Sequence, residues 1–320
     1  MNKETKIYFA PFQGITNATF RAVYARHFPG IDALFTPFFL NISSENKLPA
    51  KKAIELENLC ENGIEVIPQI LSKDADEIIR FARFCKTKGF KEINWNLGCP
   101  YPQVADKKRG SGLLPFPQEI EAILNRVMAE VEIRFSVKCR LGYYSSDEIF
   151  ALIPVFNDLH IAELTIHSRI GKQLYAGQSD IDTFAKALSM LNVPVVYNGD
   201  IFTLEDFYKV ETKLEHINAW MIGRGILSDP FLPASIKGIT VETDKSKRIK
   251  SFITDLYLSY RKTMNDRLTA LSILKEYWQH LSLSFDNPHK VFRKIKRCKT
   301  FDEYENNVAE IFTEYQWIRI

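Results

Sequence analysis

Short apolar runs recur along the chain and alternate with longer segments in which apolar residues are spaced three and four positions apart. Residues 74–88 and 118–130 show the longer spacing, which is typical of amphipathic helices. The short runs predict eight strands, at residues 7–12, 33–39, 65–71, 92–98, 134–141, 162–169, 194–200 and 219–225. Strands that alternate with helices predict parallel βα units, and eight such units predict a closed (β/α)8 TIM barrel rather than an open sheet.

The pattern changes after Lys237. Residues 238–247 are polar and predict a linker, whereas 248–264, 267–285 and 301–315 carry apolar residues at helical spacing. We therefore expect an α/β protein of two domains, with a TIM barrel at residues 1–240 and a small all-helical domain at 245–320.

Composition restricts the class of protein. The chain has 320 residues, of which 46% are hydrophobic and 25% charged, which excludes a disordered, collagenous or cysteine-framework protein. No apolar run approaches the roughly 18 residues of a membrane helix, and the N-terminal residues do not resemble a signal peptide, so we expect a cytosolic protein. The five cysteines form no Cys-x-x-Cys pair, which predicts reduced thiols and no metal site.

Positive charge collects in the helical segment. Residues 244–320 contain 15 Lys and Arg against 10 Asp and Glu, whereas the remainder contains 27 against 29. Four cations, Lys290, Arg293, Lys294 and Arg297, would share one face of a helix. Two interpretations stay open, a surface for a polyanionic partner and an ordinary solvated helix face.

Polar residues occupy the C-terminal ends of the predicted strands, where TIM barrels carry their catalytic groups. They are Gln69, Asn94, Asn96, Lys138, Arg140, His167, Arg169, the tripeptide 198–200 (Asn-Gly-Asp) and the tripeptide 223–225 (Gly-Arg-Gly). Any one of these could be a polar residue with a satisfied structural role. Because buried polar groups are costly unless paired, the convergence of six strand ends predicts a large polar ligand.

The two glycine-containing tripeptides refine the nature of this ligand. They follow the seventh and eighth predicted strands, whose loops form a phosphate site in many barrels. Glycine allows close backbone approach and Arg224 supplies a cation. We therefore predict a phosphorylated cofactor. Lys138 would then face its ring system, and a cation there stabilises the reduced form of a flavin.

One cysteine differs from the other four. Cys99 follows the fourth predicted strand, and its loop continues through Gly110-Ser-Gly112, which predicts a mobile segment at the active rim. Cys60, Cys85, Cys139 and Cys298 are interpreted as inert.

Together these residues resemble the signatures of the tRNA-dihydrouridine synthases. The matching segments are Ala-Pro-Phe-Gln-Gly-Ile-Thr at 10–16, Asn-Leu-Gly-Cys-Pro at 96–100, Val-Lys-Cys-Arg-Leu-Gly at 137–142, Ile-His-Ser-Arg at 166–169, Asn-Gly-Asp-Ile at 198–201 and Met-Ile-Gly-Arg-Gly at 221–225. The resemblance implies an enzyme that uses FMN and NADPH to reduce uridine to 5,6-dihydrouridine in tRNA, in the D-loop. This chain departs from the family at Phe12, Cys139, Ser168 and Tyr197, where Met, an aliphatic residue, Gly and a smaller residue are usual.

The resemblance also implies roles for individual residues. Those expected to bind FMN are Pro11, Phe12, Gln13, Gln69, Lys138, His167, Asn198, Gly199, Asp200, Gly223 and Arg224. Those expected to contact the flipped uracil are Asn96, Lys138, Arg140 and Arg169, and those expected to contact the tRNA backbone are Lys290, Arg293, Lys294 and Arg297. Cys99 would be the catalytic acid that protonates C5, since a thiol with a pKa near 8.5 stays protonated at neutral pH.

Two alternatives compete with this interpretation. A flavin barrel that acts on a small free substrate, such as a dihydroorotate dehydrogenase-like enzyme or an ene-reductase, shares the phosphate site but needs no basic helical domain. An RNA-binding protein that has lost catalysis should lack Lys138 or Cys99, and both are present.

We expect the protein to be a monomer.

Overall fold

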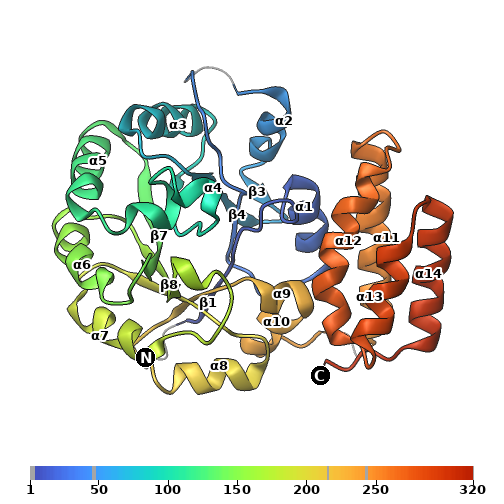
Figure 1. The fold of residues 1–320 in the computed structure, drawn as a ribbon. Coiled ribbons are helices and arrows are strands. Elements are labelled where there is room, and N and C mark those ends of the chain that lie inside the picture. The colour runs from blue at the N-terminus through green and yellow to red at the C-terminus, as the bar shows by residue number, and fades with distance from the viewer. Residues whose placement is uncertain (1–3, 45–47, 215, 242–243, 320) are drawn as a thin grey trace.

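A computed structural model describes residues 4–44, 48–214, 216–241 and 244–319. It shows a barrel of parallel strands on one side and a group of helices on the other (Figure 1). The parallel strands are β1 (Lys6–Phe9), β2 (Ala33–Phe35), β4 (Ile64–Ile67), β5 (Gln69–Ile70), β6 (Glu92–Leu97), β7 (Arg134–Gly142), β8 (Leu164–Ile170), β9 (Val195–Asn198) and β10 (Ala219–Ile222). All eight predicted strands are present, and the predicted TIM barrel is confirmed.

The third barrel strand is divided by Pro68 into β4 and β5. Proline has no N–H to donate, so it interrupts a ladder of hydrogen bonds. β4 pairs with β2 and β5 pairs with β6, so the divided strand closes the ring. The carbonyl of Pro68 still accepts from Asn94 N at 2.8 Å. A short antiparallel strand, β3 (Cys60–Glu61), which the sequence pattern did not predict, extends the sheet beside β4.

Helices surround the barrel, and four of those described begin where a polar side chain accepts a hydrogen bond from the first turn. Asn17, Asp74, Asp180 and Thr203 act in this way. The helices are α1 (Ala18–His27), α2 (Ala50–Ala53), α3 (Ala75–Thr87), α4 (Pro102–Ala105), α5 (Pro117–Glu130), α6 (Glu148–Asp158), α7 (Ile181–Met190), α8 (Leu204–Glu211), α9 (Arg224–Ser228) and α10 (Leu232–Ile236). Short 3-10 turns lie at Ile54–Leu56, Gly110–Leu113, Gly171–Gln173 and Ser282–Ser284.

The C-terminal segment is helical, as the spacing predicts. Its helices are α11 (Lys245–Thr263), α12 (Thr269–Leu281), α13 (Pro288–Arg297) and α14 (Phe301–Glu314). An aromatic cluster joins them to the barrel, since Phe252 of α11 and Tyr277 of α12 pack against Phe20 of α1, at centroid distances of 6.1 and 5.2 Å. The predicted division into residues 1–240 and 245–320 stays a prediction, and positions 242 and 243 of the linker lie outside the described residues.

Within the described ranges, every helix is too short or too polar to cross a membrane.

Candidate active site

A cleft lies at the C-terminal ends of the barrel strands, and it has two sections. Pro11, Phe12, Lys138, His167 and Tyr175 line both sections, so the two are continuous. The first section is also lined by Gln13, Pro37, Phe38, Gln69, Asn96, Gly98, Cys99, Pro100, Tyr101 and Arg140. The second is also lined by Ala10, Asn198, Gly199, Ile201, Phe202, Gly223, Arg224 and Gly225. The structure thus brings together 13 of the residues expected to bind FMN, to contact the uracil or to donate the proton.

A chain of buried amides fixes the position of the Cys99 loop. Gln69 donates from Nε2 to Asn94 Oδ1 at 2.8 Å, and Asn96 donates from Nδ2 to Gln69 Oε1 at 2.6 Å. The Oδ1 atom of Asn96 then accepts from the backbone N–H groups of Gly98 and Cys99, at 3.0 and 2.9 Å. Register explains the chain, because Gln69 lies opposite Asn94 in the parallel β5–β6 pair.

Glycines allow the Cys99 loop to fold tightly in this structure, and the mobility expected from the sequence stays a prediction. The N–H and the hydroxyl of Ser111 both donate to the carbonyl of Cys99, at 3.0 and 3.1 Å. Gly110 has a φ of +56°, and a Cβ atom there would come within 2.6 Å of that same carbonyl oxygen. A Cβ at Gly112 would overlap the backbone of Ala105. Both glycines are therefore required by close backbone approach.

The Cys99 side chain lies in the cleft wall and is 8% exposed. Burial raises the pKa of its thiol, while a hydrogen bond from the backbone of Tyr101 and the charges of Arg140 and Lys138 act in the opposite direction. Because the net change is upward, Cys99 is a thiol rather than a thiolate at neutral pH. This protonation state suits a proton donor and does not suit a nucleophile.

Lys138 has no hydrogen-bonding partner for its ammonium group among the residues that the structure describes, and it lines both sections of the cleft. Burial and the neighbouring charge of Arg140 lower its pKa to about 8. Burial together with the charges of Arg140 and Lys138 also holds the pKa of His167 well below its usual value, so this imidazole is neutral. An ammonium group in such a place has an unmet need for an acceptor, which an anionic or carbonyl-rich ligand would supply.

Arg140 is 1% exposed, and its guanidinium connects the surrounding loops through hydrogen bonds. Its Nε donates to the carbonyl of Gly98 at 3.0 Å, and its Nη1 donates to the carbonyls of Ile170 and Leu174 at 2.9 and 2.8 Å. The Nη2 group makes no hydrogen bond within the described part of the chain. Leu174 turns its carbonyl toward Arg140 with a φ of +52°, an unusual value for a residue with a side chain.

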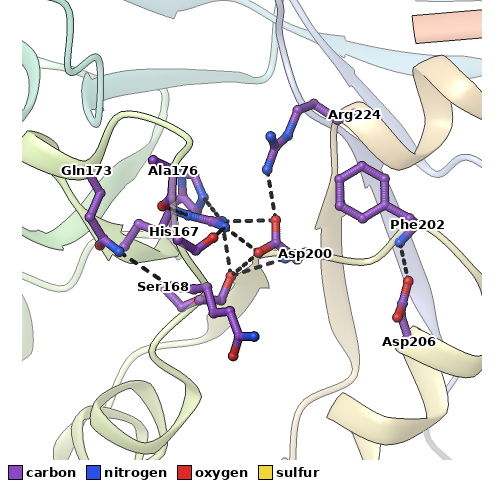
Figure 2. A network of polar contacts seen from close by, with 12 residues as sticks. His167, Ser168, Gln173, Ala176, Asp200, Phe202, Asp206 and Arg224 are labelled. Atoms are coloured by element: carbon purple, nitrogen blue, oxygen red, sulfur yellow. Dashed lines mark hydrogen bonds and ion pairs between the residues drawn. The ribbon is translucent and has the colours of Figure 1, made fainter. Parts of the chain in front are cut away.

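Asp200 and Arg169 are not among the residues that line the cleft, which differs from the ligand contacts expected of them. Figure 2 shows the Asp200 carboxylate facing Arg224. Arg169 is 1% exposed and forms two hydrogen bonds to the Asp200 carboxylate, one of them at 2.9 Å. The other Asp200 contact to a cation is from Arg224 Nη2, at 2.8 Å. Burial raises the pKa of Asp200, but the hydrogen bonds and charges of Arg169 and the charge of Arg224 outweigh burial and leave it lowered.

Arg169 also donates to the carbonyls of Ala176 and Gly177 and to Ser179 Oγ, at 3.3, 2.7 and 3.1 Å. These contacts fix the loop between β8 and α7. The guanidinium of Arg169 is thus fully used within the protein, and its position suits a role in holding this loop and Asp200.

Several cleft residues were missed by the sequence analysis. Tyr175 stands between the guanidinium groups of Arg140 and Arg224, which lie 5.5 and 5.1 Å from its ring centroid. His280 of α12 is not itself a lining residue, but its ring centroid lies 5.8 Å from that of Phe12, which lines the cleft. Neither had a sequence signal, because Tyr175 lies in an irregular loop and His280 comes near the barrel only through tertiary packing. The other lining residues that were missed include Pro37, Phe38 and Tyr101.

The basic face of α13 is smaller than the sequence suggested. Lys294 forms ion pairs with Glu310 and Glu314 of α14, at 2.5 and 3.4 Å. These acids are 16 and 20 residues away, so the sequence spacing gave no sign of them. By contrast, Lys290, Arg293 and Arg297 are exposed, and none forms an ion pair with another described residue. These four cations all lie on α13, away from the cleft lining.

No group of three or more His, Cys, Asp or Glu side chains in the described residues is arranged to hold a metal ion. The cleft instead offers organic ligands three cations (Lys138, Arg140 and Arg224), several amides and the first-turn N–H groups of α9, which have no partner within that helix. This donor set fits a ligand with many acceptors and an anionic end. The fold and the cleft together define a TIM-barrel protein with a polar, cationic ligand cleft at the C-terminal ends of its strands.

Comparison with known sequences identifies the family. The family model for dihydrouridine synthase (Dus) matches residues 8–316. The tRNA-dihydrouridine synthase B of Pasteurella multocida is 30% identical over 235 residues, which are 72% of this chain and 68% of that protein. The tRNA-dihydrouridine(16) synthase of Neisseria meningitidis serogroup B is 27% identical over 326 residues, which are 98% of this chain and 96% of that protein. The chain therefore belongs to the dihydrouridine synthase family, and the expected oxidoreductase class is confirmed.

Solved structures share the fold. Histamine dehydrogenase from Rhizobium sp. 4-9 matches with a TM-score of 0.56 and 11% identity, over 79% of this chain and 49% of that one. Morphinone reductase matches with a TM-score of 0.52 and 12% identity, over 76% of this chain and 88% of that one. The present chain thus spans about half the length of histamine dehydrogenase.

Proposed function

We propose that this protein binds FMN in the cleft and uses NADPH to reduce a uridine of tRNA to 5,6-dihydrouridine. The observation that carries the proposal is the placement of the Cys99 thiol in the same cleft section as Lys138 and Arg140. Relatives that match over more than nine tenths of this chain are named for position 16. We therefore propose position 16 of the D-loop as the target.

The second section of the cleft would hold the FMN phosphate. Gly199, Gly223 and Arg224 line it, and the peptide groups there can approach a ligand closely. Lys138, Gln69 and His167 would bind the ring system, because they line the first section or its junction with the second. FMN held by these residues would supply hydride-transfer chemistry, with uracil C6 as the acceptor.

The remaining steps belong to side chains of this protein. The target base is inside a stack in folded tRNA, so it has to be flipped out to reach the cleft. Negative charge that develops on the uracil carbonyl oxygen and C5 would be stabilised by Arg140 Nη2 and by Lys138. The Cys99 thiol then gives its proton to C5, which completes the saturated ring.

One experiment tests the activity and separates it from the alternatives. The purified protein is loaded with FMN and supplied with NADPH and either an unmodified tRNA transcript or free uridine, and nucleosides from the digested products are quantified by mass spectrometry. We expect dihydrouridine to form in tRNA only, and mapping of the modified nucleotide should place it at tRNA position 16. Equal turnover of free uridine would favour a small-molecule flavin enzyme, and failure to bind any flavin would favour an RNA-binding protein without catalysis.

The predicted cytosolic location and monomeric state stay predictions.

A further inference from the structure

An aromatic pair, with one ring exposed and the other buried, lies beside a cation on the barrel rim and has no role in the site described above. Tyr144 is 64% exposed, and its ring meets that of buried Tyr143 edge to face at a centroid distance of 4.7 Å. The ammonium of Lys172 lies 5.0 Å from the Tyr143 centroid and 5.5 Å from that of Tyr144. We call Tyr143, Tyr144 and Lys172 the rim platform.

The backbone beneath the rim platform is fixed by one side chain. The Glu148 carboxylate accepts hydrogen bonds from the N–H groups of Tyr143, Tyr144 and Ser145, at 2.8, 2.9 and 3.0 Å. Gly142 completes the tight turn, because a Cβ atom there would overlap the carbonyl oxygen of Ser145. Tyr144 therefore presents an exposed ring on a backbone that is already ordered, so binding to it requires little further loss of entropy.

The rim platform is continuous with the cleft. The N–H of Lys172 donates to the carbonyl of Tyr143 at 3.0 Å. Gly171 packs so closely against the Tyr143 ring and Ser111 Oγ that a Cβ atom has no room there. The segment that begins at Gly171 reaches the cleft wall four residues later, at Tyr175. A polymer that places one unit in the cleft can therefore place a neighbouring unit on the rim platform.

The charge at the rim platform is positive where a ligand would lie. Lys172 is exposed and forms no ion pair with any other residue that the structure describes. The Glu148 charge is compensated by its three backbone donors, and Asp147 is the exposed acid of the same loop. An aromatic face next to an unpaired ammonium is the combination that binds single-stranded nucleic acid, with the base stacked on the ring and the phosphate near the cation.

We propose that the rim platform binds an unpaired nucleotide adjacent to the target uridine, with its base stacked on Tyr144 and its phosphate near Lys172. The proposal rests on the tRNA substrate of the proposed function and adds a contact surface on the barrel itself. The nucleotide has to be unpaired because a base within a helix would not expose its face to the ring.

Steady-state kinetics of the FMN-loaded, full-length enzyme on an unmodified tRNA transcript test the proposal. Tyr144→Ala should raise the KM for tRNA about 5- to 150-fold, the range for loss of one stacked base, with kcat unchanged. Tyr144→Phe keeps the ring and should behave like the unsubstituted protein. Lys172→Ala should lower the salt dependence of tRNA binding by about one phosphate contact. Tyr208→Ala is the matched control, because Tyr208 is 51% exposed and lies on α8.

A second set of transcripts, each abasic at one nucleotide next to the target, identifies the partner. With the transcript that is abasic at the nucleotide that stacks on Tyr144, the Tyr144→Ala variant and the unsubstituted protein should show the same KM. The proposal is overturned if Tyr144→Ala matches Tyr208→Ala, or if no abasic transcript removes the difference. If the Tyr144→Ala protein loses its FMN, Lys172→Ala and the abasic transcripts with the unsubstituted protein decide, because the transcript that is abasic at the stacked nucleotide should raise the KM of the unsubstituted protein. Failure of the proposed function gives a different result, because the unsubstituted protein would then form no dihydrouridine.

Discussion

The Asp200 carboxylate holds the guanidinium of Arg224 at 2.8 Å, from a position beside the cleft rather than inside it. Its second partner, Arg169, is buried and positively charged, so the group of three side chains has a net positive charge. Arg224 also lies over the rings of Tyr175 and Phe202, at 5.1 and 5.3 Å. Asp200 is thereby placed to orient Arg224 without presenting an uncompensated negative charge to a phosphate.

The first prediction concerns this relationship. Asp200→Asn should weaken the affinity for FMN about tenfold and leave the affinity for riboflavin unchanged, because riboflavin has no phosphate for Arg224 to contact. Arg224→Ala should make the binding free energy of FMN less favourable by about 1.5–3 kcal/mol, the range for a charge-assisted hydrogen bond. Flavin fluorescence titration measures each affinity.

The double variant separates positioning from general damage. If Asp200 acts through Arg224, adding Asp200→Asn to Arg224→Ala should change the FMN affinity no further. Equal losses of FMN and riboflavin would show instead that Asp200 supports the fold of this region. Ser179→Ala, which removes another hydrogen bond to the same carboxylate, serves as the control.

The second prediction concerns the proton donor. Cys99→Ala should retain FMN and still accept electrons from NADPH, but it should form dihydrouridine about 10²–10⁴-fold more slowly, as expected for loss of a general acid. Single-turnover assays with pre-reduced enzyme measure the step directly. Cys60→Ala is the matched control, because Cys60 is exposed and far from the cleft lining. Turnover of Cys99→Ala near that of Cys60→Ala would leave the thiol with a structural role only.

The third prediction concerns tRNA binding by α13. Neutralising Arg293 and Arg297 together should weaken tRNA binding and reduce the slope of log affinity against log salt by roughly 0.7–0.9 for each lost phosphate contact. Lys294→Ala should change the slope much less, since its charge is already paired with Glu310 and Glu314. NADPH oxidation without tRNA should be the same in all variants. A slope that is unchanged in the double variant would mean that the tRNA follows another surface.

The fourth prediction concerns stability against pH. Glu163 accepts a hydrogen bond from the Tyr8 hydroxyl at 3.0 Å near the N-terminal end of the barrel strands. Burial and the nearby charge of Glu92 raise the pKa of Glu163 from 4.5 to about 7. The folded protein therefore binds a proton that the unfolded chain releases, and this contribution is complete below about pH 4.5 and is lost as the pH rises through about 7.

Glu163→Gln should remove that part of the pH dependence. The free energy of unfolding at pH 8 should rise by at most about 3 kcal/mol relative to the unsubstituted protein, with little difference at pH 5. Urea unfolding at the two pH values measures the change. An equal effect at both values would show that the substitution acts through packing and not through titration.

The sequence predicted the barrel because its strand ends and helix faces are local patterns. Lys138 and Arg140 alternate with Cys139 along one strand, so their common face could be read without the structure. The polar strand ends meet at one rim for the same reason. What local patterns could not supply was the partner of each polar group. Arg169, for example, donates hydrogen bonds to Asp200 and to carbonyls of the following loop, and these partners lie up to 31 residues from it in the sequence.

Two departures from the family pattern turn out to be neighbours. The Ser168 hydroxyl donates to Tyr197 Oη at 3.3 Å and to the carbonyl of Asn198 at 3.2 Å. The Tyr197 hydroxyl in turn occupies the space that a Cβ atom at Gly199 would need. Ser168 and the larger Tyr197 therefore fit one another, and a sequence comparison that treats each position separately would not connect them.

The three hydrogen bonds of Arg140 have a consequence for how such an enzyme can diverge. Because one guanidinium ties the carbonyl of Gly98 to those of Ile170 and Leu174, a shift of the loop after β6 transmits to the loop after β8. A lineage that acquires a new target uridine cannot remodel either loop by itself without leaving buried acceptors unpaired. The two loops at its rim have to change together, through correlated substitutions that keep the carbonyls bound by Arg140 paired.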